Sequence, residues 1–108
     1  MSKFTNCLVG AALLFSAGLA GAGENHALAA MTHADAAIEH GAMGHAKVLV
    51  DHAKEALKHA LAGKNNAHLA EAATHLQAAI EHGNMGHADV ATSHAREAYV
   101  HIKAATRE

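Results

Sequence analysis

Cysteine, proline and tryptophan are almost missing from this chain of 108 residues, which contains one cysteine and neither of the other two. Cys7 lies in an N-terminal stretch that we expect to be removed, so the mature protein would have no disulfide, zinc–thiolate site or Cys-x-x-Cys-His haem attachment. No proline interrupts a helix, and β-branched residues are sparse. Since alanine, leucine, glutamate, lysine and histidine dominate, the composition predicts an all-α protein.

Strong charge of either sign is also missing. The formal net charge is −2 with neutral histidines, and no basic stripe runs along the sequence. A nucleic-acid partner is therefore not expected, because such proteins need clustered lysine and arginine side chains to contact phosphates. The slight negative balance favours cations as partners.

The N-terminus has the three parts of a secretory signal peptide. Lys3 supplies the positive start, Leu8 to Leu19 form an apolar run, and Ala20-Gly21-Ala22 offers a cleavage motif. We therefore expect residues 1–22 to be a signal peptide and residues 23–108 to form one small domain, with no membrane contact after cleavage. Less favoured alternatives are an uncleaved anchor, for which the run is short, and cleavage at Ala27-Leu28-Ala29.

Twelve histidines are the most regular feature that is present. They form two sets of six with steps of seven, seven, five, seven and seven residues, and the second set repeats the first 42 residues later. A step of seven returns a side chain to nearly the same face of an α-helix, so each helix would carry a line of imidazoles. The sets are His26, His33, His40, His45, His52 and His59, then His68, His75, His82, His87, His94 and His101.

The 42-residue repeat predicts two helical hairpins, over residues of about 26–61 and 68–103. Each helix is marginal alone and must bury a face against its neighbours. Short connections favour an antiparallel up-down-up-down four-helix bundle. The four expected helices cover roughly residues 25–40, 45–62, 67–82 and 87–105.

Glycine and asparagine mark the expected helix ends. Gly63 suits the position after a helix, and Asn66 suits an N-cap. Four further glycines are expected to break the helices at the two hairpin turns. They are Gly41, Gly44, Gly83 and Gly86.

Apolar or small residues recur one, four and five positions after the histidines, as Ala53, Ala56 and Leu57 do after His52. This pattern places histidine beside the helix-packing seam, at heptad position g, and not within it. The seam is rich in alanine, so each residue buries little area. We therefore expect modest stability in the absence of metal.

An antiparallel hairpin brings the g positions of its two helices side by side. The register predicts six two-histidine rungs about 10.5 Å apart, from the 1.5 Å rise per residue. All twelve histidines are candidate metal ligands, because imidazole is the commonest side-chain ligand of transition metals near neutral pH. The predicted rungs are His40 with His45, His33 with His52, His26 with His59, His82 with His87, His75 with His94, and His68 with His101.

Carboxylates and thioethers lie close to the histidines. Glu55, Glu71 and Glu97 are each within one turn of two histidines of their own helix, as ligands, hydrogen-bond acceptors or ordinary surface residues. Met43 and Met85 occupy His-Gly-x-Met-Gly-His turns, where a thioether can bind Cu(I). We favour the simpler interpretation that these methionines close the end of the bundle as hydrophobic plugs.

The sequence resembles the small metal-binding proteins of the bacterial periplasm, the SmbP type. The resemblance covers His26 to His101 and rests on the seven-residue histidine steps, the His-Gly-x-x-Gly-His turns, segments such as Ala37-Ile38-Glu39-His40, and the secretion signal. It implies a histidine-rich four-helix bundle in the periplasm, associated with copper handling, with the twelve histidines as metal ligands.

The sequence therefore predicts a non-enzymatic, monomeric protein that buffers, scavenges or carries several divalent ions. Cu(II) is favoured because it leads the divalent series, and Zn(II) and Ni(II) also suit imidazole. No serine, cysteine or carboxylate pair forms a recognisable catalytic set. The alternatives are a pH-responsive helical adaptor or structural protein and, less favoured, a haem or redox carrier. A partner for metal transfer is possible but is not identified by any motif.

Overall fold

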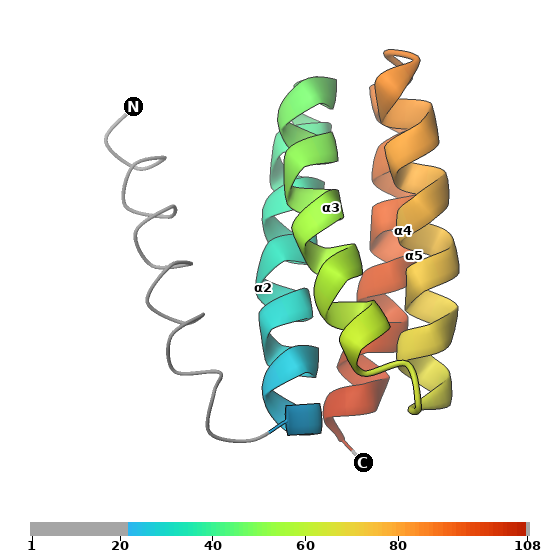
Figure 1. The fold of residues 1–108 in the computed structure, drawn as a ribbon. Coiled ribbons are helices and arrows are strands. Elements are labelled where there is room, and N and C mark those ends of the chain that lie inside the picture. The colour runs from blue at the N-terminus through green and yellow to red at the C-terminus, as the bar shows by residue number, and fades with distance from the viewer. Residues whose placement is uncertain (1–21, 108) are drawn as a thin grey trace.

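The computed structural model describes residues 22–107, which form four α-helices (Figure 1). They are α2 (Ala22–Ala42), α3 (Ala46–Ala62), α4 (Ala67–Asn84) and α5 (Ala88–Thr106). The all-α class is thus confirmed, and the predicted helix ends differ from the observed ones by three residues at most. Apart from Ala22, the expected signal peptide lies outside the described residues.

The four helices pack as a closed antiparallel bundle. α2 packs against α3 and α5, α4 packs against the same two helices, and α3 also approaches α5 across the diagonal. The α2–α3 and α4–α5 turns lie at one end of the bundle, and the α3–α4 turn lies at the other (Figure 1). This is the predicted up-down-up-down arrangement of two hairpins.

Alanine makes up most of the core. Of the 19 buried hydrophobic residues in the described part of the chain, 14 are alanine, so neighbouring helices can approach closely. Leu57, Ile80 and Tyr99, which follow histidines at the predicted seam positions, are partly buried and pack against this core. The largest fully buried side chains are Leu49, Leu69, Leu76 and Ile102.

The glycines of the hairpin turns have two different roles. Gly44 and Gly86 have φ values of +81° and +79°, a left-handed conformation that lets the chain reverse. The prediction that Gly41 and Gly83 also break helices is wrong, because both lie inside a helix. A Cβ atom at Gly83 would overlap Cγ2 of Val50, so the missing side chain allows α4 to approach α3.

The α3–α4 connection follows the prediction. The Gly63 N–H donates to the carbonyl oxygens of His59 and Ala60 at 3.2 Å, which closes the last turn of α3. Asn66 is the N-cap of α4, and its Oδ1 accepts hydrogen bonds from the backbone N–H groups of His68 at 2.8 Å and Leu69 at 3.3 Å. These bonds satisfy backbone groups that a helix end leaves without partners.

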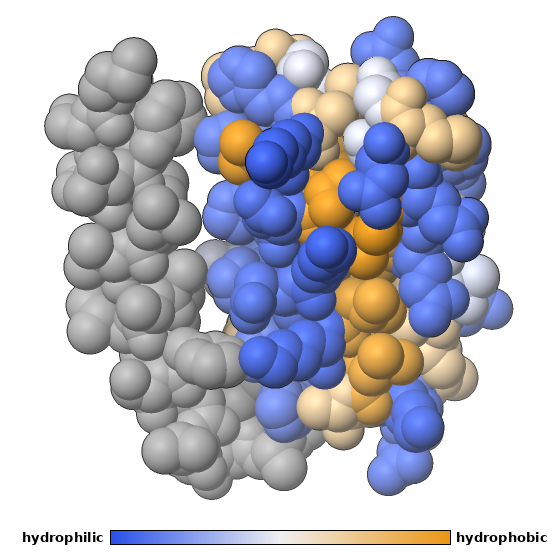
Figure 2. Space-filling model, turned by 45° about the horizontal axis from the view of Figure 1, so that its top comes forward, coloured by the Kyte–Doolittle hydropathy of each residue, from blue (hydrophilic) through white to orange (hydrophobic). Residues whose placement is uncertain are grey.

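The surface is mostly hydrophilic, with an apolar stripe down one face. Figure 2 shows this stripe running lengthwise between hydrophilic side chains on either side. Within residues 22–107, no helix combines the length and the apolar character needed to cross a lipid bilayer.

The contact at Gly83 leads to a prediction about stability. Gly83→Ala should lower the free energy of unfolding by roughly 1–3 kcal/mol, because the added methyl group overfills the space beside Val50. Alanine is intrinsically the better helix former by about 1 kcal/mol, so an open site would give the opposite sign. Urea denaturation measures the change, with Asn84→Ala at the neighbouring exposed position as the control.

Candidate metal site

Each hairpin gathers its six histidines into one column along the line where its two helices meet. The first column lies between α2 and α3, and the second lies between α4 and α5. Every histidine predicted to pair across a hairpin has its ring centroid 5.4–6.1 Å from that of its partner. The pairing read from the sequence is therefore confirmed as a ring contact. Metal ligation by the twelve histidines stays a prediction.

The predicted rungs are not isolated from one another, because each column also contains contacts between successive rungs. His33 lies 5.9 Å from His59, and His40 lies 5.5 Å from His52, with ring planes 7° and 9° apart. Equivalent contacts occur in the second column at 5.3 and 5.5 Å. The histidines of one helix thus fit between those of the other, and each column is a continuous zigzag of imidazoles.

Burial keeps part of the first column neutral. His33 and His59 are only 8% and 6% exposed. Burial lowers the pKa of His33, His52 and His59 below its ordinary value of 6.5. Neighbouring imidazoles lower the pKa of His52 and His59 further, whereas the Glu55 carboxylate acts in the opposite direction on all three. Neutral imidazole is the form that binds metal, so these rings are ready to ligate at neutral pH.

A carboxylate joins the buried part of the first column. One ligand atom each from His33 of α2 and from Glu55 and His59 of α3 lie within 4.8 Å of one another. His59 also interacts with His26, with 3.2 Å between the two Nδ1 atoms. Two imidazoles and one carboxylate from two helices therefore converge where a cation can be held.

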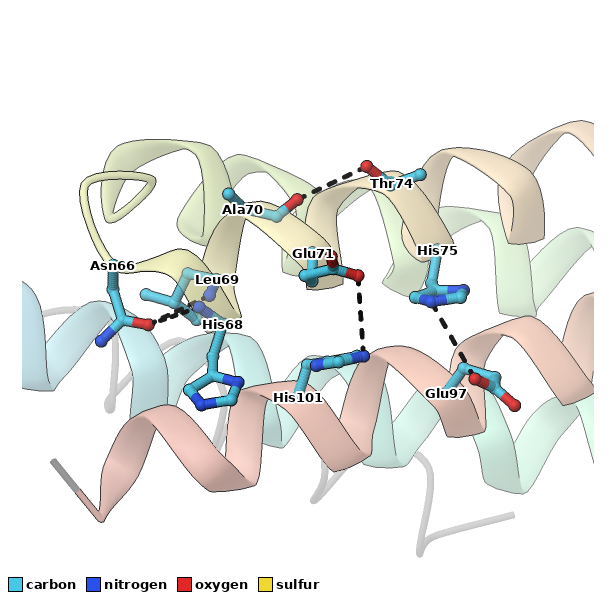
Figure 3. Close-up of polar contacts among 9 residues, drawn as sticks. All are labelled: Asn66, His68, Leu69, Ala70, Glu71, Thr74, His75, Glu97 and His101. Atoms are coloured by element: carbon cyan, nitrogen blue, oxygen red, sulfur yellow. Dashed lines mark hydrogen bonds and ion pairs between the residues drawn. The ribbon is translucent and has the colours of Figure 1, made fainter.

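A second group lies in the other hairpin. Glu71 and His75 of α4 and His101 of α5 also have ligand atoms within 4.8 Å of one another. Glu71 Oε1 is 3.8 Å from His101 Nε2, and Glu97 Oε1 is 3.9 Å from His75 Nε2 (Figure 3). The sequence spacing predicts contacts of each glutamate only with histidines of its own helix. The contacts across the hairpin accompany the zigzag stagger, which this spacing does not predict.

The turn residues differ from the expected arrangement. Met43 and Met85 are 51% and 58% exposed, so they do not plug the end of the bundle. His45 and His87 precede α3 and α5 and are exposed, and neither side chain caps its helix. The Nδ1 atom of His82 is buried and, among the residues that the structure describes, has no hydrogen-bond partner.

Comparison with known proteins agrees with this geometry. A family model described as small metal-binding protein matches residues 1–105 of the chain. A search of the curated proteins finds no match.

The lowered pKa values lead to a prediction for the metal-free protein. The unfolded chain binds protons at its ordinary histidine pKa of about 6.5, while the three buried imidazoles of the folded chain bind them only at lower pH. Their contribution to stability should be complete above pH 6.5 and be lost as the pH falls through the lowered values. Urea denaturation in excess chelator at several pH values measures this loss.

His33→Gln should reduce the slope of this pH dependence, because it removes one of the three histidines whose pKa burial lowers. A metal-free fold that becomes more stable between pH 6.5 and pH 5 would contradict the prediction.

Proposed function

Because the chain belongs to the small metal-binding protein family, we propose that it buffers, scavenges or carries several divalent transition-metal ions. The observation that supports this function best is the pair of histidine columns. Every pair of facing rings offers two nitrogen ligands from two helices, and ring centroids lie 5.3–6.1 Å apart throughout. An ion between two such rings ties together the two helices of a hairpin.

Copper(II) is the proposed main cargo. Nitrogen and oxygen ligands bind it more tightly than the other divalent ions of the first transition series, and imidazole suits it. Zinc(II) and nickel(II) are accepted by the same ligands with lower affinity. The two groups of imidazole and carboxylate add mixed nitrogen and oxygen sites to the imidazole pairs.

The distribution of ligands supports a storage or transport role over catalysis. The histidines are spread along two columns over the length of the bundle and do not converge on one enclosed pocket. Most of them are partly or fully exposed, so ions can be exchanged with solvent or with another protein. An enzyme would need one site that positions a substrate beside a reacting group.

The proposed location is the periplasm. It rests on the signal peptide expected at residues 1–22. The mature protein would then act as a monomer of about 86 residues, from 23 to 108.

Titration with Cu(II) at pH 7 tests the proposed function. We expect several ions per chain, up to one for each of the six histidine pairs, as measured by equilibrium dialysis and metal analysis. Bound ions should also raise the melting temperature, because they bind the folded state preferentially. Binding should be lost below about pH 6 as imidazole is protonated. Fewer than two bound ions per chain at pH 7 would reject the model of several sites.

A further inference from the structure

Four side chains of the second hairpin alternate around a square (Figure 3). α4 contributes Glu71 and His75, and α5 contributes Glu97 and His101, each pair four residues apart and therefore adjacent on its helix. Across the hairpin, Glu71 faces His101 at 3.8 Å and Glu97 faces His75 at 3.9 Å. Each edge of the square thus joins a carboxylate to an imidazole.

The two imidazoles occupy one diagonal of this square. The ring centroids of His75 and His101 are 5.5 Å apart, with ring planes 12° from parallel. One nitrogen of each ring and one oxygen of Glu71 also lie within 4.8 Å of one another. The fourth corner is Glu97, which contacts His75.

The separations suit a tetrahedral zinc ion after a small closure. Ligand atoms 2.0–2.2 Å from zinc lie about 3.3–3.6 Å from one another. Ligand atoms of Glu71, His75 and His101 lie within 4.8 Å of one another, and Glu97 contacts His75 at 3.9 Å, so the side chains have to move closer together to surround an ion. The glutamate side chains are 62% and 63% exposed and can rotate into place. Two imidazoles and two carboxylates are a ligand set that zinc accepts.

The first hairpin has only three of the four side chains that form this square. Shifting the numbers by 42 residues places His33, Glu55 and His59 at the positions of His75, Glu97 and His101. Ala29 stands at the position of Glu71, so this hairpin has two imidazoles and one carboxylate. The two repeats are therefore different in chemistry, although their histidine spacing is the same.

The additional carboxylate decides which hairpin binds a divalent ion more tightly. Two carboxylates neutralise the charge of the ion, whereas one leaves a net positive charge in the more buried setting of His33 and His59. Both the Coulomb attraction and the cost of removing water from the ion favour the second hairpin.

We propose that Glu71, His75, Glu97 and His101 form a distinct site for zinc(II), which is filled before any site of the first hairpin. This inference rests on the proposed metal-binding function and assigns unequal roles to the two repeats.

The experiment is a titration of the purified, metal-free protein with zinc(II) alone at pH 7.5. Nuclear magnetic resonance spectra of the ¹⁵N-labelled histidine rings report which rings bind the first equivalent. We expect the signals of His75 and His101 to change before those of His33 and His59. In a parallel affinity titration, Glu71→Gln and Glu97→Gln should each raise the dissociation constant of the first zinc ion about 10- to 100-fold.

A matched variant serves as the control. Glu81→Gln removes the same charge from an exposed position of α4. It should weaken the first binding event by no more than about twofold, within the range of a screened surface charge. Circular dichroism establishes that the helices of every variant are intact.

The outcomes separate this inference from the proposed function. If the first equivalent of zinc changes the rings of both hairpins together, or if Glu81→Gln weakens binding as much as Glu71→Gln, the distinct site is refuted while the metal-binding function stands. If the protein binds neither zinc(II) nor copper(II), both are refuted. Selective changes at His75 and His101, together with weakening by only the Glu71 and Glu97 variants, support the site.

Discussion

The close approach of the two helices within each hairpin is the constraint on which the histidine columns depend. Alanine at most of the buried positions leaves little side-chain volume between neighbouring helices. The imidazoles stand at the edges of these narrow seams, so they meet across the hairpin at centroid distances of 5.3–6.1 Å. Larger core residues would move the helix axes apart and separate the rings. The composition of the core therefore determines how closely the histidines of a hairpin can approach one another.

This arrangement favours the neutral form of the histidines for two reasons. Packing beside the core favours neutral rings, as the lowered pKa values of His33, His52 and His59 show. Closely spaced imidazoles would also repel one another if they were charged. Metal binding is compatible with both, because the ion is bound by neutral imidazoles and holds together rings that would repel one another if they were protonated. The fold and the proposed cargo thus favour the same protonation state.

The sequence was sufficient for the fold and the histidine pairing because both depend on periodicity. The seven-residue steps and the five-residue step across each turn determine which rings face one another. The stagger between the two helices of a hairpin could not be predicted in this way, since periodicity does not give the shift of one helix along the other. For the same reason, the contacts of Glu71 and Glu97 with the opposite helix were missed. The exposure of Met43 depends on the shape of the turn, which periodicity does not describe.

The zigzag of each column affects how a bound ion could move along the bundle. A ring such as His33 has two neighbours across the hairpin, His52 at 6.0 Å and His59 at 5.9 Å, so neither pairing is geometrically preferred. If the columns bind ions as proposed, an ion held by one pair could reach the next by releasing a single imidazole while keeping the other, in steps of about 5 Å, half of a seven-residue helical repeat. The ion would then keep a protein ligand throughout. The exposed His45 of the first column and His87 of the second would be the ends of these two paths at the turns.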